Sequence, residues 1–243
     1  YNDKLREVST KFKEANVKAT ILDLRYNAGG SLDCVQLLAT ILVPSARMGT
    51  PMAYLEYNDK NIDKSTTIDF DQEVLKTGTN LNQNVLIVIT SGTTAGAAEM
   101  LLTSLYKKDQ YPNIIVMGSA SKGQTVATEQ FINETYRWSV NPVVCTVYNS
   151  DHVAGEEPFI LTPSDQFKIS ETSIDGTTNY SQFLPFGDPK ERMLSIAIQT
   201  LEGTYPPKDE DKEEETPSTK SSKIEKNVSS PASRRFAGGL RIK

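Results

Sequence analysis

Residues Leu22-Asp-Leu-Arg-Tyr-Asn-Ala-Gly-Gly30 are the strongest local indication of the fold. It continues an apolar run that begins at Ala19 and is typical of a buried strand, and it ends in two glycines that allow a tight turn. Apolar residues at helical spacing follow from Leu32 to Leu42. Consecutive glycines before a helix can turn backbone amides toward an oxyanion, and the helix dipole adds positive charge there. An ordinary strand-to-helix turn is the alternative interpretation.

A second unit of the same kind lies further along the chain. Val85–Ile89 indicates another buried strand, which leads into Thr90-Ser-Gly-Thr-Thr94, and residues 95–105 are rich in Ala, Leu and Met and should be helical. A serine at the top of such a turn would be an exposed nucleophile. Taken alone, this unit is also compatible with an ordinary capped helix.

The remaining patterns complete an α/β domain over residues 1–203 with a mixed sheet and an added β-hairpin. Residues 45–83 are polar and give no clear assignment. The other expected elements are a helix around Leu5–Phe12, a strand at 114–117, a hairpin of 126–132 with 136–140, a strand at 143–147, and a helix that starts at Asp188-Pro189 and stops at Gly203.

The composition changes after Gly203. Residues 204–235 hold an acidic run and then a Ser/Lys/Pro mixture, so they cannot bury enough apolar surface to order and should form a charged, disordered linker. A less polar end, residues 236–243, follows. Such a linker spans roughly 30 Å, enough for Phe236–Ile242 to reach a groove on the domain, although an unbound end is the simpler expectation.

Composition excludes several classes of function. The 243 residues carry a net charge of −5, which disfavours nucleic acid as a partner. There is no apolar run long enough for a transmembrane span. One histidine and two cysteines without metal-binding spacing argue against a zinc site and against a Ser-His-Asp triad, and no cofactor is expected. The chain begins at Tyr1 without Met or a signal sequence, which we interpret as an excised or processed fragment.

The two turns, in this order, resemble motifs of the tail-specific (C-terminal processing) serine peptidases, particularly their Bacteroidetes-type members. The family's Asp-Leu-Arg-x-Asn-x-Gly-Gly turn corresponds to Asp23–Gly30, and its Thr-Ala-Ser-Ala-Ser-Glu motif to Thr94–Glu99. A third family turn fits Gly118–Gly123 loosely, and Leu184–Pro189 resembles the start of the last core helix. The likeness spans roughly residues 1–203.

This resemblance implies a core related to crotonase and Clp protease and a Ser-Lys dyad, in which a neutral lysine accepts the serine proton. In this chain Gly96 fills the nucleophile position, and glycine has no side chain to attack with. The base position is Lys122 or Gln124, depending on the alignment, and the spacing from Glu99 favours Lys122. The oxyanion donors would be the amides of Gly29 or Gly30 and of Ala97.

The resemblance leaves three functions open. The first is a domain that binds extended polypeptide chain ends beside a strand but hydrolyses them poorly or not at all. The second is an active peptidase whose serine was mutated to Gly96 or is replaced by a nearby hydroxyl. The third is a scaffold without either property. The candidate hydroxyls are those of Ser91, Thr93, Thr94 and Ser121. By resemblance, the protein would work in the periplasm or at the cell surface, as a lipoprotein or secreted protein.

Overall fold

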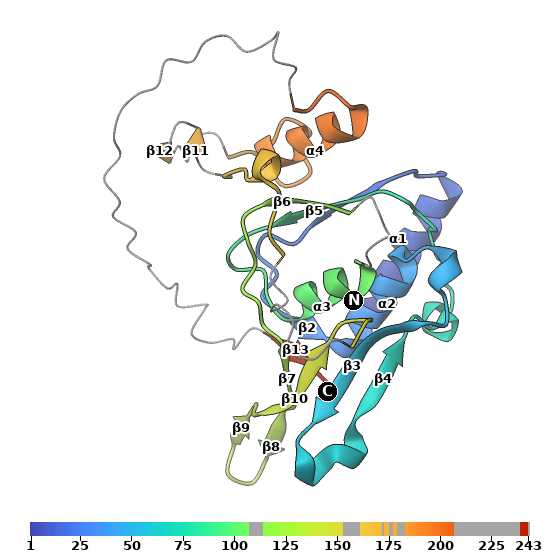
Figure 1. Cartoon of the computed structure of the whole chain (residues 1–243), viewed down its shortest axis with the longest axis vertical. Coiled ribbons are helices and arrows are strands. Elements are labelled where there is room, and N and C mark those ends of the chain that lie inside the picture. The colour runs from blue at the N-terminus through green and yellow to red at the C-terminus, as the bar shows by residue number, and fades with distance from the viewer. Residues whose placement is uncertain are drawn as a thin grey trace.

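Three parallel strands form the centre of the domain (Figure 1). They are β1 (Thr20–Asp23), β5 (Leu86–Thr90) and β6 (Ile114–Gly118), in the order β1-β5-β6. The computed structural model describes residues 1–106, 114–152, 161–171, 173–174, 177–178, 183–206 and 239–242. The apolar runs that predicted buried strands coincide with all three, because a parallel strand covered on both faces needs apolar residues on both.

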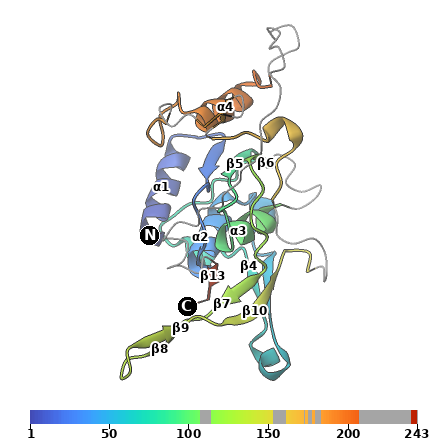
Figure 2. The ribbon, with the colours of Figure 1, turned by 90° about the vertical axis from the view of Figure 1, so that its left-hand side faces the viewer.

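Helices cover both faces of this sheet. α1 (Asn2–Glu14), α2 (Leu32–Leu42) and α3 (Ala97–Leu105) lie on one face, and α4 (Arg192–Glu202) lies on the other (Figure 2). The side chains of β5 alternate accordingly. Leu86 and Val88 join the cluster that includes α2 and α3, whereas Ile87 and Ile89 pack with Met193 and Ala197 of α4.

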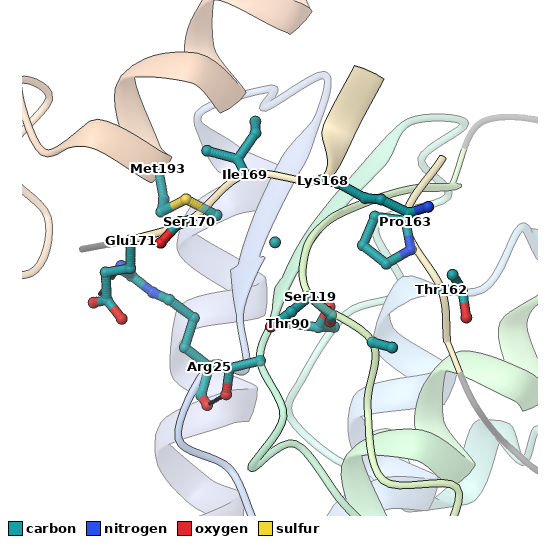
Figure 3. A pocket seen from close by; sticks show the side chains of 13 residues that line it. Arg25, Thr90, Ser119, Thr162, Pro163, Lys168, Ile169, Ser170, Glu171 and Met193 are labelled. Atoms are coloured by element: carbon teal, nitrogen blue, oxygen red, sulfur yellow. Dashed lines mark hydrogen bonds and ion pairs between the residues drawn. The ribbon is translucent and has the colours of Figure 1, made fainter. Parts of the chain in front are cut away.

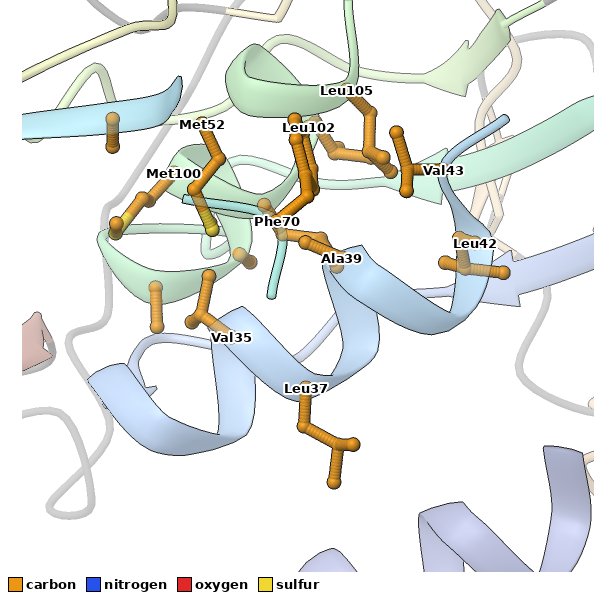
Figure 4. Packing of buried hydrophobic residues seen from close by; sticks show 14 of the residues in the cluster. Val35, Leu37, Ala39, Leu42, Val43, Met52, Phe70, Met100, Leu102 and Leu105 are labelled. Atoms are coloured by element: carbon orange, nitrogen blue, oxygen red, sulfur yellow. The ribbon is translucent and has the colours of Figure 1, made fainter. Parts of the chain in front are cut away.

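The larger core lies between α2, α3 and the strands around them (Figure 4). Val35 and Ala39 of α2 face Met100 and Leu102 of α3, and Phe70 fills the space between the two helices with none of its surface exposed. The central residues of this cluster are almost completely buried, so the helix pair is fixed by apolar packing.

A second sheet packs on the far side of α2 and α3. Its strand order is β2-β13-β7-β10-β3-β4, and it mixes parallel with antiparallel pairs. The strands are β2 (Gly30–Ser31), β3 (Pro51–Tyr57), β4 (Thr66–Asp69), β7 (Val126–Thr128), β10 (Val143–Tyr148) and β13 (Leu240–Arg241). The strand β13 comes from the C-terminal end of the chain and lies between β2 and β7.

Two small hairpins complete the fold. β8 (Phe131–Asn133) pairs with β9 (Trp138–Val140), and this hairpin projects from the domain in Figure 2. β11 (Ser173–Ile174) pairs with β12 (Thr177–Thr178). Among the described residues, no helix combines the length and the apolarity needed to cross a bilayer.

The prediction of a mixed α/β fold is confirmed, and two element boundaries are corrected. The expected hairpin of 126–132 with 136–140 is shorter, because β7 pairs with β10 and only β8 pairs with β9. The last helix begins at Arg192 rather than at Pro189, because the carboxylate of Glu191 accepts the Leu194 amide at 2.9 Å and thereby caps the helix.

The tail is only partly described. Residues 207–238, which include most of the predicted linker and Phe236, lie outside the described residues, so the division at residues 203 and 235 stays a prediction. The end of the chain differs from the simpler expectation of an unbound terminus, because Leu240 and Arg241 form a strand of the second sheet.

Candidate functional site

The two predicted turns meet in the structure. The Ala95 amide donates to the carbonyl oxygen of Asn27 at 3.0 Å. A β-carbon built on Gly30 would lie 3.3 Å from the Cβ of Ala97. The turns after β1 and β5 are therefore in van der Waals contact, because neighbouring parallel strands end at the same edge of their sheet.

Hydroxyl groups of the second turn hold it against the first. Thr94 Oγ1 donates to the Leu24 carbonyl at 2.8 Å and Thr93 Oγ1 to the Arg25 carbonyl at 2.7 Å. The Ser91 hydroxyl also donates to the Arg25 carbonyl. These three hydroxyls were candidates for a substitute nucleophile, and in the structure each bonds a backbone carbonyl of the first turn.

The fourth candidate hydroxyl, that of Ser121, lies in a different segment, the loop after β6. It is 8% exposed, and its Oγ accepts the Leu161 amide at 3.0 Å. This bond ties the loop that carries Lys122 and Gln124 to the segment that begins at residue 161.

Gly96 begins α3 with a backbone that favours glycine, with φ of 56° and ψ of −106°. The nearest atoms to a β-carbon built there would be Gly239 Cα at 2.5 Å and the Leu240 amide nitrogen at 2.7 Å. The position predicted for a nucleophile therefore lies directly against the backbone of the C-terminal segment.

Glu99 is the residue that orders this site, and the sequence analysis assigned it no role. Its side chain is fully buried, and Oε2 accepts the amides of Gly96 at 2.8 Å and Gln124 at 2.9 Å. Oε1 accepts the Gly123 amide at 2.5 Å. A glutamate three residues after a helix N-cap is the local signal for the first of these bonds. The other two join α3 to a turn 24 and 25 residues away.

The two candidates for the base position lie differently. Lys122 is exposed, and its backbone amide donates to the Thr94 carbonyl at 3.0 Å. Gln124 is partly buried and turns its amide toward the C-terminal segment, so that a β-carbon on Gly239 would lie 2.9 Å from Gln124 Nε2. The structure thus brings Gln124 close to the segment that covers Gly96.

The C-terminal segment is bound through its backbone. The Gly30 amide donates to the Gly239 carbonyl oxygen at 3.1 Å, and the Ile242 amide donates to the Thr128 carbonyl at 3.1 Å. Leu240 lies opposite Gly30 on β2 and Ala127 on β7. Gly239 therefore places its carbonyl against one of the two glycines predicted as oxyanion donors.

The buried side chain of Arg25, in the first turn, forms ion pairs with three carboxylates (Figure 3). Arg25, 3% exposed, bonds Asp23 at 2.6 Å, Glu171 at 2.8 Å and Glu191 at 3.0 Å. Burial alone would lower the pKa of the guanidinium, but the bonds to Asp23 and Glu191 outweigh it and raise the pKa. The centroid of the Phe186 ring lies 5.1 Å from the guanidinium carbon of Arg25.

A pocket of about 470 Å³ adjoins this arginine, between the ends of β5 and β6 and α4 (Figure 3). Ser119, Pro163, Lys168 and Met193 are among its lining residues. Neither the pocket nor the carboxylate partners of Arg25 were predicted, because their residues lie far apart in the sequence.

Comparison with known proteins places the chain in a family. The sequence model of peptidase family S41 matches residues 1–156. The chain belongs to peptidase family S41. A comparison with curated protein sequences gave no match.

Solved structures resemble this S41 domain. A protein assigned to the S41 proteases of Bacteroides fragilis is 37% identical, with a TM-score of 0.74, over 84% of this chain and 49% of that one. The photosystem II D1 C-terminal processing protease is 16% identical, with a TM-score of 0.48, over 70% of this chain and 39% of that one. A lipoprotein from Streptococcus agalactiae is 23% identical, with a TM-score of 0.48, over 67% of this chain and 56% of that one. The chain thus spans about half the length of the Bacteroides protein that it matches.

Proposed function

We propose that this S41 domain binds extended polypeptide chain ends and hydrolyses them poorly or not at all. The observation that carries the proposal is Gly96 at the start of α3, in the position that the resemblance assigns to the nucleophilic serine. Serine-type hydrolysis is the chemistry of the family, and it requires a side-chain oxygen at that position. The nearby hydroxyls of Ser91, Thr93 and Thr94 bond backbone carbonyls instead.

Backbone amides that can hold a peptide carbonyl remain in place without the nucleophile. The Gly30 amide already donates to a peptide carbonyl at 3.1 Å, which supports its assignment as an oxyanion donor. Gly29 and Ala97 are the other residues assigned to this role. A peptide held by such amides would be bound but not cleaved.

The base position is assigned to Gln124 in this proposal. Its side chain reaches the segment beside Gly96, whereas Lys122 is exposed. A neutral carboxamide does not accept a proton near pH 7, so both members of the dyad would be absent. Lys122 as a retained base is the alternative that the experiment below separates.

The natural setting follows from the family resemblance. We propose a periplasmic or cell-surface location, with unfolded or extended polypeptide as partner and with neither nucleic acid nor a cofactor involved. The second candidate function is an active peptidase in which a natural serine at position 96 was replaced by glycine. The sequence of codon 96 in the natural gene distinguishes the two candidates.

Proteolysis of an unstructured substrate such as casein tests the proposal. The unmodified chain should show no cleavage, because a site without its nucleophile retains at best about 10³–10⁴-fold catalysis over water, too little for detection. If Gln124 fills the base position, only Gly96→Ser combined with Gln124→Lys should cleave. If Lys122 is the base, Gly96→Ser alone should cleave, and adding Lys122→Ala should abolish the activity.

The matched control is Gly92→Ser in the same turn, where an added β-carbon would meet nothing within 4 Å. It should remain inactive both alone and combined with Gln124→Lys. Robust cleavage by the unmodified chain that is lost on Ser91→Ala or Thr94→Ala would refute the proposal and indicate a relocated nucleophile.

A further inference from the structure

The last strand of the second sheet lies where a bound peptide would lie. We propose that residues 239–242 are a built-in ligand of the peptide groove, which keeps the groove closed to other polypeptides until the segment is released. This inference rests on the proposed function, because it treats the space between β2 and β7 as the site for extended polypeptide.

The backbone contacts are those of an added strand. Leu240 and Arg241 pair in parallel with Gly30 and Ser31 on one side, and with Ala127 and Thr128 on the other. The Ile242 amide and the Gly239 carbonyl each make a hydrogen bond of 3.1 Å to these neighbours, and Thr128 Oγ1 donates to the Leu240 carbonyl at 3.3 Å. An extended peptide that inserts between two strands gains affinity from such main-chain bonds, whatever its sequence.

The register of the segment places one peptide bond at the reactive position. The backbone from Gly239 to the Leu240 nitrogen lies within 2.7 Å of the point where a side chain of residue 96 would begin. The Gly239 carbonyl oxygen accepts the Gly30 amide, which is one of the proposed oxyanion donors. The Gly239–Leu240 peptide therefore occupies the place of a scissile bond.

Glycines on both sides permit this close approach. A β-carbon on Gly29 would lie 2.4 Å from Gly239 backbone atoms, and one on Gly96 would lie 2.5 Å from Gly239 Cα. On Gly239 itself, a β-carbon would meet Gln124 Nε2 at 2.9 Å. The groove thus accepts glycine at the position of Gly239, and a larger residue there would require the end of the Gln124 side chain to move.

The next residue supplies the apolar anchor. Leu240 is 1% exposed and belongs to the core cluster that includes Val35, Ala97 and Ala127, and Ile242 packs against the same cluster. The groove therefore takes glycine at the first of these positions and a large aliphatic residue at the second. The chain itself carries this pair close to its end.

Covalent attachment strengthens the occupancy. The linker predicted from the composition of residues 204–235 would give an effective concentration of about 1 mM at the groove. If the same segment as a free peptide binds with a Kd of about 10 μM, this effective concentration keeps about 99% of the grooves occupied. The apparent affinity of an external peptide is then about 100-fold weaker.

Amide hydrogen exchange on the full chain tests whether the segment is docked. The Ile242 and Gly30 amides should be protected in the unmodified chain, and Leu240→Asp should accelerate exchange at both at least tenfold. Gly239→Val should do the same without placing a charge in the core. The control Leu201→Asp, at a leucine of α4 that is 40% exposed, should leave both amides protected. Random-coil exchange of Ile242 in the unmodified chain would overturn the inference.

Binding of a labelled peptide tests whether the groove is closed by the segment. The probe is the octapeptide Phe-Ala-Gly-Gly-Leu-Arg-Ile-Lys, which repeats residues 236–243. Leu240→Asp should bind it at least tenfold more tightly than the unmodified chain or Leu201→Asp does. Equal binding by all three proteins would overturn the inference.

Protection of Ile242 without any probe binding by Leu240→Asp would also overturn it, because the segment would then be a fixed strand and not a ligand. Repeating the proteolysis series in the Leu240→Asp background, where the segment is released and a side chain at position 96 has room, tests the proposed function separately, so a failure of this inference can be told apart from a failure of that function.

Discussion

Glu99 is the residue on which the geometry of the site depends most. Its carboxylate accepts three backbone amides from two turns, those of Gly96, Gly123 and Gln124, and no part of its side chain reaches solvent. An ionised carboxylate suits this task because it only accepts hydrogen bonds.

Glu99→Gln should therefore destabilise the protein by about 1–3 kcal/mol, because the amide group of glutamine presents a donor to at least one of these N–H groups and leaves it without an acceptor. Urea denaturation measures the change. Glu202→Gln, at an exposed glutamate at the end of α4, should stay within about 0.5 kcal/mol. Equal stabilities of the two variants would show that the three bonds contribute nothing.

At the scale of elements, Arg25 joins β1 to α4. Its guanidinium bonds Glu191, the N-cap residue of α4, and Glu171, which precedes β11. These carboxylates are 6% and 18% exposed, so they need a buried cation as partner.

Arg25→Met should cost about 3–5 kcal/mol of unfolding free energy, because it leaves these carboxylates without a counter-charge in a poorly solvated place. Lys168→Met is the matched control. Lys168 pairs with Asp165 across an exposed surface, so its loss should change stability by at most about 1 kcal/mol. Similar losses in both variants, measured by urea denaturation, would contradict the assigned role of Arg25.

A second element-scale prediction concerns the strand β10. Cys145 lies in its middle, between Ala127 of β7 and Tyr57 of β3, and is 4% exposed. Burial raises the pKa of the Cys145 thiol to about 11, against a smaller lowering by the backbone of Ala127. At pH 8 only about one thiol in 10³ is then ionised.

Cys145 should therefore resist iodoacetamide at pH 8 in the folded protein and react once urea unfolds it, and its reactivity should rise as the pH approaches 11. Mass spectrometry of the Cys34→Ser variant follows this thiol alone. Cys34, which is only partly buried, should react faster in the Cys145→Ser variant. Equal labelling rates in the two folded variants would refute the prediction.

At the scale of the whole molecule, the chain consists of a layered domain and a long tail that returns to it. Two sheets enclose α2 and α3, and α4 covers the outer face of the central sheet (Figures 1 and 2). The tail contributes β13 to the second sheet, so the N-terminal and C-terminal parts of the sequence share one set of backbone hydrogen bonds.

Limited trypsin digestion should cut the chain first between residues 204 and 235, because that composition offers almost nothing to bury. The domain should survive as a fragment that begins at Tyr1. Arg137, in the projecting β8–β9 hairpin, is an internal control for an exposed site with regular structure, and it should be cut later. Cleavage within the domain before the tail would contradict the predicted linker.

Local patterns of residues were enough to predict the central strands, two of the helices and the family. Continuous apolar runs predicted the three strands of the central sheet. Helical periodicity predicted α2, and a composition rich in Ala, Leu and Met predicted α3. The motifs around Gly29 and Gly96 indicated the family, and the second of them carries the proposal that the nucleophile is absent. These features depend on side chains close together in the chain, so their chemistry can be read in order.

Contacts between groups far apart in the sequence could be known only from the folded chain. Arg25 bonds Glu191, which is 166 residues away in the sequence. The side chain of Gln124, rather than that of Lys122, turns toward the segment beside Gly96. The docking of Leu240 between β2 and β7 depends on backbone hydrogen bonds, which nearly every residue can form, and on a cavity built by residues far away in the chain. No local pattern carries that information, because it exists only once the sheet has closed around the segment.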